Sequence, residues 1–240
     1  MDAERLRISK FNLLLGALPA PDMALLKPHM RDVALTQGTV LQEQGERIDQ
    51  VYFPHAGIVS LLAVMQHGTA VETATIGREG AIGSLAGLGT RHSHSRAVVQ
   101  VAGTASRITA SQFRAAANKS EAIRELIVSY GETLLIQVQQ TAACNALHDV
   151  EARLSRWLLQ AHDRLDGDTI QLTHEFLSQM LGVRRTSVTV VATELQRAGL
   201  IRYQRGHIQI LDRPGLEARA CECYAAVRRR IARVMPETER

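Results

Sequence analysis

Residues 172–211 carry a pattern that few folds can accommodate, because two short amphipathic helices meet at a single glycine. The first helix is predicted over residues 174–181, with Thr173 as its N-cap. Gly182 permits a tight turn, since glycine adopts positive φ at little cost. The second helix is predicted over residues 184–198. The segment therefore predicts a helix-turn-helix.

The chain after the second helix is predicted to form a β-wing. Gly199 ends the helix in the position that glycine favours. Two alternating strands follow, at Ile201–Tyr203 and Ile208–Leu211, around a turn at Gln204–His207.

The start of the second helix has several residues that its core does not need, because Val188, Val191 and Leu195 already supply the apolar face. A recognition helix presents its first residues to base edges in the major groove of DNA. Residues 184–213 also contain six arginines and only two acidic residues, and such an excess of positive charge favours contacts with DNA phosphates. The alternatives are that the whole sequence is rich in arginine, or that the two helices and the hairpin have a purely structural role. The free residues, predicted to face double-stranded DNA, are Arg184, Arg185, Thr186, Thr189 and Val190.

A long helix is predicted over residues 121–147, about 40 Å at 1.5 Å per residue. Its apolar stripe recurs every three or four residues. Pairing with a second copy would bury this stripe and make the chain a homodimer, whereas packing against the chain's own β domain is the alternative. The stripe consists of Ile123, Ile127, Tyr130, Leu134 and Val138.

Residues 31–108 are predicted to form an antiparallel roll or sandwich, because short apolar runs alternate with glycines 7 to 12 residues apart. The runs are Thr39–Leu41, Val51–Phe53, Ile58–Leu62 and Ala97–Val101. Residues 1–30 are predicted to be helical, with a break at Pro19–Pro21. Thr109 and Gln112 predict a capping box that opens a short helix.

The predicted fold class is therefore α+β with three parts. An antiparallel β-roll occupies residues 1–118, a long dimerisation helix occupies residues 119–147, and a winged helix-turn-helix domain occupies residues 148–240. Asp149 is expected to cap the first helix of the last part, and a polar turn at Asp166–Asp168 to end it.

The composition also limits the class of protein and the cellular compartment that can be expected. No run approaches the roughly 18 apolar residues of a membrane span, and the charged N-terminus has no cleavage site of a secretory signal. The odd number of cysteines, three, predicts no disulfide framework. We expect a cytoplasmic protein with no membrane partner and no enzymatic activity.

At this point the chain resembles the Crp/Fnr family of transcriptional regulators, named for the catabolite activator and the fumarate-nitrate regulator. The resemblance is carried by Leu172–Glu175, Gly182–Val188 and Gly199–Ile201, and more loosely by the glycine-punctuated region. It implies a roll like the cyclic-nucleotide-binding jelly roll, a pseudo-palindromic DNA site and a contact with RNA polymerase. It also implies that Arg185 reads a guanine and that Thr186 and Val190 set sequence preference. The residues implied near phosphates are Thr173, His174, Arg184 and Ser187.

The resemblance also identifies a possible effector pocket. Relatives that bind a cyclic nucleotide hold the ribose with a glutamate and the phosphate with an arginine, and the matching segments here are Gly83–Ser84–Leu85–Ala86 and Ser95–Arg96. Ser84 and Ser95 replace those two charged anchors, and Arg96 is shifted by one residue to the opposite face of a strand. We therefore expect an unidentified effector or none, with a cyclic-nucleotide-responsive regulator as the alternative.

Two groups of residues could bind a metal, but the sequence favours neither. Cys221 and Cys223 are predicted to lie on one amphipathic helix and to face different sides, and no cysteine precedes Cys144 as an iron–sulfur relative would require. His92 and His94 could form a cupin-type pair, but no glutamate follows them. The sequence therefore predicts no metal and no cofactor.

Overall fold

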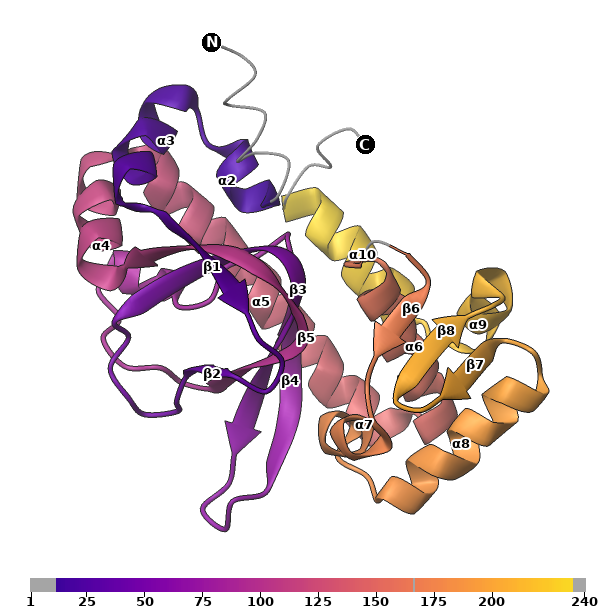
Figure 1. The fold of residues 1–240 in the computed structure, drawn as a ribbon. Helices are drawn as coiled ribbons and strands as arrows, with labels where there is room; N and C mark the ends of the chain where they lie inside the picture. Colours follow the sequence, from indigo (N-terminus) through magenta and orange to yellow (C-terminus); the bar gives the residue numbers. More distant parts are fainter. Residues whose placement is uncertain (1–11, 166, 235–240) are drawn as a thin grey trace.

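A computed structural model describes residues 12–165 and 167–234. Figure 1 shows two lobes, a β-rich N-terminal lobe and a smaller C-terminal lobe, with the long helix α5 (Glu121–Leu147) running from one to the other. Residues 1–11 of the segment predicted to be helical, 1–30, and Asp166 of the predicted turn lie outside the described residues. None of the helices within the described ranges is long and apolar enough to cross a membrane.

The N-terminal lobe is built on a five-stranded antiparallel sheet in the order β1-β5-β3-β4, with β2 also paired to β5. Two predicted strands, Val51–Phe53 and Ile58–Leu62, form one continuous strand, so their separation was wrong. Gly57 allows this, because it has φ +89° and a Cβ there would lie 2.6 Å from the Val101 carbonyl oxygen. The strands are β1 (Arg31–Leu35), β2 (Val40–Gln42), β3 (Gln50–Val64), β4 (Ala70–Ile76) and β5 (Arg96–Thr109).

Short helices close the ends of this roll. The predicted break at Pro19–Pro21 is confirmed only at its first residue, because Pro19 is the N-cap of α3 and the helix begins at Ala20. Thr109 caps α4 as predicted, with its hydroxyl oxygen accepting from the Gln112 N–H. Asn12 caps α2 and also donates its amide to the carbonyl oxygens of Pro54 and Gly80, at 2.8 and 2.9 Å. The elements are α2 (Leu13–Ala17), α3 (Ala20–Leu26), the 3₁₀ helices η1 (Lys27–His29) and η2 (Ser84–Leu88), and α4 (Ala110–Lys119).

Helix α5 has the predicted bounds but not the predicted contacts. Ile123, Ile127 and Tyr130 are at most 3% exposed, because the roll and the N-terminal helices of the same chain cover them. Leu134 packs partly against the same core, and Val138 is half-buried. The prediction that this stripe forms a dimer interface was therefore wrong for its buried members, and the alternative, packing on the chain's own roll, is observed for them.

The described part of the C-terminal lobe packs five helices around a three-stranded sheet in the order β6-β8-β7. Asp149 caps α6 as predicted. The predicted single C-terminal helix is in fact two helices, separated at residues 220–222. The elements are α6 (Val150–His162), β6 (Thr169–Gln171), α7 (His174–Leu181), α8 (Arg185–Arg197), β7 (Ile201–Gln204), β8 (His207–Ile210), α9 (Arg213–Arg219) and α10 (Cys223–Val234).

The two lobes meet through buried polar groups on β4 and α6. Glu72 is 7% exposed and accepts hydrogen bonds from the Ser60 hydroxyl and from the Trp157 indole N–H, the latter at 2.9 Å. Nearby, Arg164 pairs with Glu79 at 2.7 Å. Burial raises the pKa of Glu72 to about 7, although its hydrogen bonds oppose that shift. The interface between the lobes thus contains a carboxyl group that titrates near neutral pH.

We predict that this carboxyl makes the protein less stable as the pH rises. The folded chain binds a proton at Glu72 up to about pH 7, whereas the unfolded glutamate loses it near pH 4.5. The stabilisation is therefore complete below pH 4.5 and is lost between these values, by about 3 kcal/mol in the free energy of unfolding. Glu72→Gln cannot titrate, so denaturant unfolding at pH 5 and pH 8 should show a smaller pH dependence than the parent. Equal pH dependence in both proteins would contradict the assignment.

Candidate DNA-binding surface and effector roll

The two helices of the helix-turn-helix form where the sequence predicted them. Thr173 caps α7 by accepting from the Phe176 N–H, and Gly182 follows with φ +62°. Arg184 is the N-cap of α8 with an extended backbone, so the predicted helix start at 184 shifts by one residue. Val188 and Leu195 are fully buried, and Val191 is nearly so. The fixed inner face of α8 determines which of its residues face outward.

The outward residues gather at the first two turns of α8. Val190, on the face opposite this core, is 57% exposed. Ser187 is half-buried, and its N–H bonds to the Arg184 carbonyl oxygen. Side chains on this exposed surface include Arg184, Arg185, Thr186, Thr189 and Val190.

His174 connects α7, α8 and the wing. Its ring stacks on Tyr203 of β7 with centroids 4.2 Å apart, and its Nδ1 lies 3.0 Å from the Thr189 hydroxyl. That hydroxyl donates its single proton to the Arg185 carbonyl oxygen, so Nδ1–H must donate to Thr189. Burial lowers the pKa of His174, and the charge of Arg185 lowers it further. A neutral His174 thus holds the start of α8 against the wing.

The wing is a tight hairpin between β7 and β8. Arg205 has φ +49° and Gly206 has φ +79°, as a two-residue turn of type I′ requires. Gln196 of α8 accepts from the Tyr203 N–H at 2.7 Å and ties the wing to the helix. Arg205 and His207 are exposed at the tip of the wing, although neither was predicted from the sequence to contact DNA.

The candidate effector residues lie on two separate elements of the roll. Gly83 precedes η2, which contains Ser84, Leu85 and Ala86. Ser84 is 6% exposed and borders a space of only about 10 Å³ among apolar side chains, far less than a nucleotide needs.

The second candidate segment, Ser95–Arg96, leads into β5. Ser95 precedes the strand, and its carbonyl oxygen accepts from the Ser93 hydroxyl at 2.7 Å. The Arg96 guanidinium is paired with Glu43 at 2.7 Å, and this contact lowers the pKa of the Glu43 carboxyl. Arg96 is therefore engaged by a carboxylate of the same chain.

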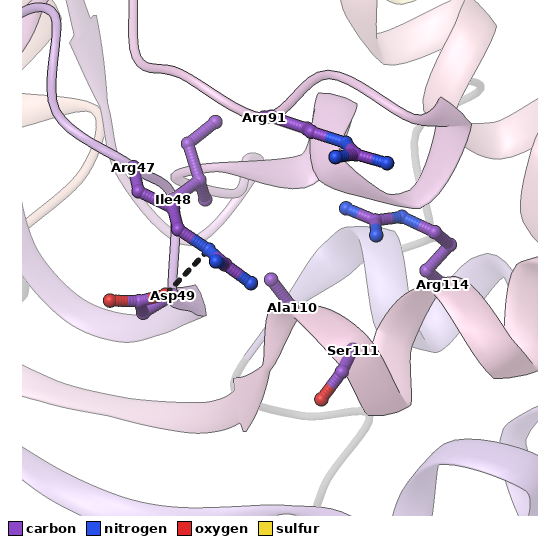
Figure 2. A pocket seen from close by; sticks show the side chains of 7 residues that line it. All are labelled: Arg47, Ile48, Asp49, Arg91, Ala110, Ser111 and Arg114. Atoms are coloured by element: carbon purple, nitrogen blue, oxygen red, sulfur yellow. Dashed lines mark ion pairs between the residues drawn. The ribbon is translucent and has the colours of Figure 1, made fainter.

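A pocket of about 210 Å³ on the roll was missed from the sequence, because its residues come from three separate segments. Figure 2 shows the Arg91 and Arg114 side chains pointing toward one another, with Arg47 reaching toward the same space. Asp49 pairs with Arg47 at 3.3 Å, and both side chains are largely exposed. Three arginines against one carboxylate give this pocket a positive charge.

Cys144, His148, Cys221 and Cys223 come together in the fold, which their positions in the sequence did not predict. The expectation that Cys221 and Cys223 face different sides of one helix was wrong, since α9 ends at Arg219 and α10 begins at Cys223. Cys221 lies in the turn between the two helices, where its side chain is free of helical spacing. The cluster lies where α5, α6 and α10 meet.

Comparison with known families supports both lobes. A model of the Crp-like helix-turn-helix domain matches residues 152–219, and a model of the cyclic nucleotide-binding domain matches residues 32–120. A comparison with curated proteins found no match. The fold of the two lobes and the exposed face of α8 together define a DNA-binding transcriptional regulator with a roll of the cyclic-nucleotide-binding type. The chain belongs to the Crp/Fnr family of transcriptional regulators.

Solved structures share this fold at low sequence identity. FixK2 of Bradyrhizobium japonicum aligns with a TM-score of 0.69 and 14% identity over 80% of this chain and 98% of that one. A protein of Eubacterium rectale described as a transcriptional regulator of the Crp/Fnr family aligns with a TM-score of 0.66 and 16% identity, over 87% and 97%. A Crp/Fnr regulator of Thermus thermophilus aligns with a TM-score of 0.63 and 23% identity, over 79% and 98%.

Proposed function

We propose that the chain acts as a cytoplasmic homodimer that binds a pseudo-palindromic DNA site and contacts RNA polymerase, without catalysing a reaction. The observation that carries this proposal is the exposed cluster of arginine, threonine and valine on the first two turns of α8, opposite a complete core. The proposed division is a roll at residues 1–118, a dimerisation helix at 119–147 and a DNA-binding domain at 148–240.

Within this proposal, Arg185 reads a base and Thr186 and Val190 set sequence preference, because the first residues of a recognition helix reach base edges. Arg184 precedes the helix and approaches a phosphate together with Thr173 and Ser187. The hydrogen bond from His174 to Thr189 supports a positioning role for both residues beside these contacts.

The proposed dimer uses the face of α5 that the roll leaves open. Val128 is 49% exposed and Leu135 is 57% exposed, and they lie seven residues apart. Ala142, seven residues further, is also exposed. A seven-residue repeat of apolar side chains is typical of two helices that pack along a common seam. This face therefore replaces the buried stripe as the proposed interface.

The proposed roll does not use a cyclic nucleotide as its effector. Serine occupies both anchor positions, at Ser84 and Ser95, and Arg96 is held by Glu43. Losing a charge-assisted phosphate contact removes a main source of affinity for such a ligand. The effector of the roll is left open by this proposal.

We predict that Arg185→Ala and Arg184→Ala weaken DNA binding differently. Arg185→Ala should cost about 1–3 kcal/mol on the preferred site and relax preference at one base pair in each half-site. Arg184→Ala should weaken all sequences alike and reduce the salt slope by about one. Arg197→Ala, at the far end of α8, serves as the control. Binding to matched and singly substituted sites measures these effects, and a uniform loss for Arg185→Ala would make Arg185 a phosphate ligand.

We predict that Leu135→Asp produces monomers, since a dimer would bury an unpaired charge at the centre of its seam. Sedimentation of the variant and the parent protein measures the change. Leu211→Asp, at a leucine that is 46% exposed in the C-terminal lobe, should remain dimeric. If Leu135→Asp sediments as a dimer, the outer face of α5 is not the interface.

We predict that calorimetry with cyclic AMP shows no saturable binding at micromolar concentrations. A micromolar dissociation constant would overturn this expectation. In that event, two variants would locate the ligand. Loss of binding in Arg114→Ala would place it in the arginine-lined pocket. Loss of binding in Ser84→Ala would place it where relatives hold the ribose of a cyclic nucleotide.

A further inference from the structure

The cysteine–histidine cluster joins the end of α5 to the C-terminal helices. Cys144 and His148 are four residues apart at the end of α5, so they share one face. Cys221 and Cys223 come from the turn between α9 and α10 and from the first residue of α10. One ligand atom from each of the four residues lies within 4.8 Å of all the others.

Two of the distances in the cluster are close to the edges of a metal-centred tetrahedron, and all of them are at most 4.8 Å. Cys144 Sγ and Cys221 Sγ are 3.5 Å apart, and Cys223 Sγ and His148 Nδ1 are 3.6 Å apart. Metal–sulfur bonds of about 2.3 Å and metal–nitrogen bonds of about 2.0–2.1 Å give tetrahedral edges of about 3.8 and 3.6 Å. A single ion can therefore occupy the centre with small movements of the side chains.

Groups around the cluster hold the ligand atoms in position. Glu222 lies 3.2 Å from His148 Nε2, which leaves Nδ1 directed at Cys223. A carboxylate on the distal nitrogen is the usual partner of a metal-bound histidine, since it fixes the ring and the tautomer. Gln140 also donates its amide to Cys223 Sγ at 3.0 Å. These contacts resemble an outer ligand shell.

Burial and charge also fit an anionic metal centre. The three cysteines are at most 8% exposed. Arg153 and Arg156 are 7% and 5% exposed, and their Nε atoms have no hydrogen-bond partner among the described residues. Arg156 interacts electrostatically with Cys144, and Arg153 does so with both Cys144 and Cys221. Three thiolates and one divalent ion carry a net charge of −1, which these guanidinium groups would balance.

We propose that Cys144, His148, Cys221 and Cys223 bind one Zn²⁺ ion in a closed tetrahedral site. Thiolate and imidazole ligands in this geometry select zinc, and four protein ligands leave no position for a substrate. The compact spacing favours one ion over an iron–sulfur cluster, whose ligands bind irons that are separated from one another. The ion fastens α10 to the end of α5, at the joint between the long helix and the DNA-binding lobe.

The test begins with the unaltered full-length protein, purified under reducing conditions without a metal-affinity tag. Elemental analysis should find about one zinc per chain. After removal by a chelator, added Co²⁺ should give the visible absorption and the sulfur-to-cobalt charge-transfer band of a tetrahedral thiolate site. Zn²⁺ should displace the cobalt and raise the melting temperature.

Variants assign the ion to these residues. Cys223→Ser and His148→Ala should lose the cobalt spectrum, whereas His92→Ala, at an exposed histidine of the roll, should keep it. Glu222→Gln leaves all four ligands in place, so it should fold and bind zinc about 10- to 100-fold more weakly. An unchanged affinity in Glu222→Gln would overturn the assigned ring orientation.

Three results would overturn the proposal itself. One is a folded protein with three free thiols that binds neither Zn²⁺ nor Co²⁺ at micromolar concentration. A second is a Cys144–Cys221 disulfide in mass spectra of protein purified without reductant, with no metal present, which would identify a redox pair instead. The third is iron with acid-labile sulfide.

Discussion

Both lobes depend on the way α5 divides its surface, because this helix of 27 residues packs into the core of the roll and also contacts α10 of the C-terminal lobe. Ile123, Ile127 and Tyr130 complete the core of the roll, so the first half of the helix cannot leave its own chain without exposing that core. Leu135 and its neighbours on the opposite face remain available to a second copy. The same helix then ends at Cys144 and His148, beside the DNA-binding lobe.

The contact between the lobes combines apolar packing with buried polar pairs, since Ile58 of β3 belongs to the same buried cluster as the core of the C-terminal lobe. Glu72 accepts from Trp157, and Arg164 pairs with Glu79, so polar groups with few alternative partners define how the lobes meet. A buried polar group costs free energy whenever its partner is removed. Such a contact therefore fixes one arrangement while it is complete, and it is weakened when Glu72 loses its proton. The helix-turn-helix lies directly beside it, since Val71 of β4 approaches Gly182 of the turn.

The cysteine–histidine cluster and the arginine-lined pocket are groups of chemically reactive or charged side chains that lie outside the motifs that identify the family. The helix-turn-helix is encoded in about 40 consecutive residues, so its turn glycine, caps and apolar spacing can be recognised together. The cluster joins residues more than 70 positions apart, and the pocket joins Arg47, Arg91 and Arg114 from separate segments. Neither has a local pattern, because chain topology alone brings its members together.

The sequence by itself determined the local elements: the bounds of α5, the caps at Thr109, Asp149 and Thr173, the turn at Gly182 and the wing. These depend on hydrogen bonds and backbone preferences within a few residues. Tertiary structure decided which surface each apolar helix face packs against, and where a run of helical spacing is divided into two helices. Periodicity shows that Ile127 is buried but not by which surface, and it does not show that the last helix breaks before Cys223. Both depend on packing between residues distant in sequence, which no local spacing records.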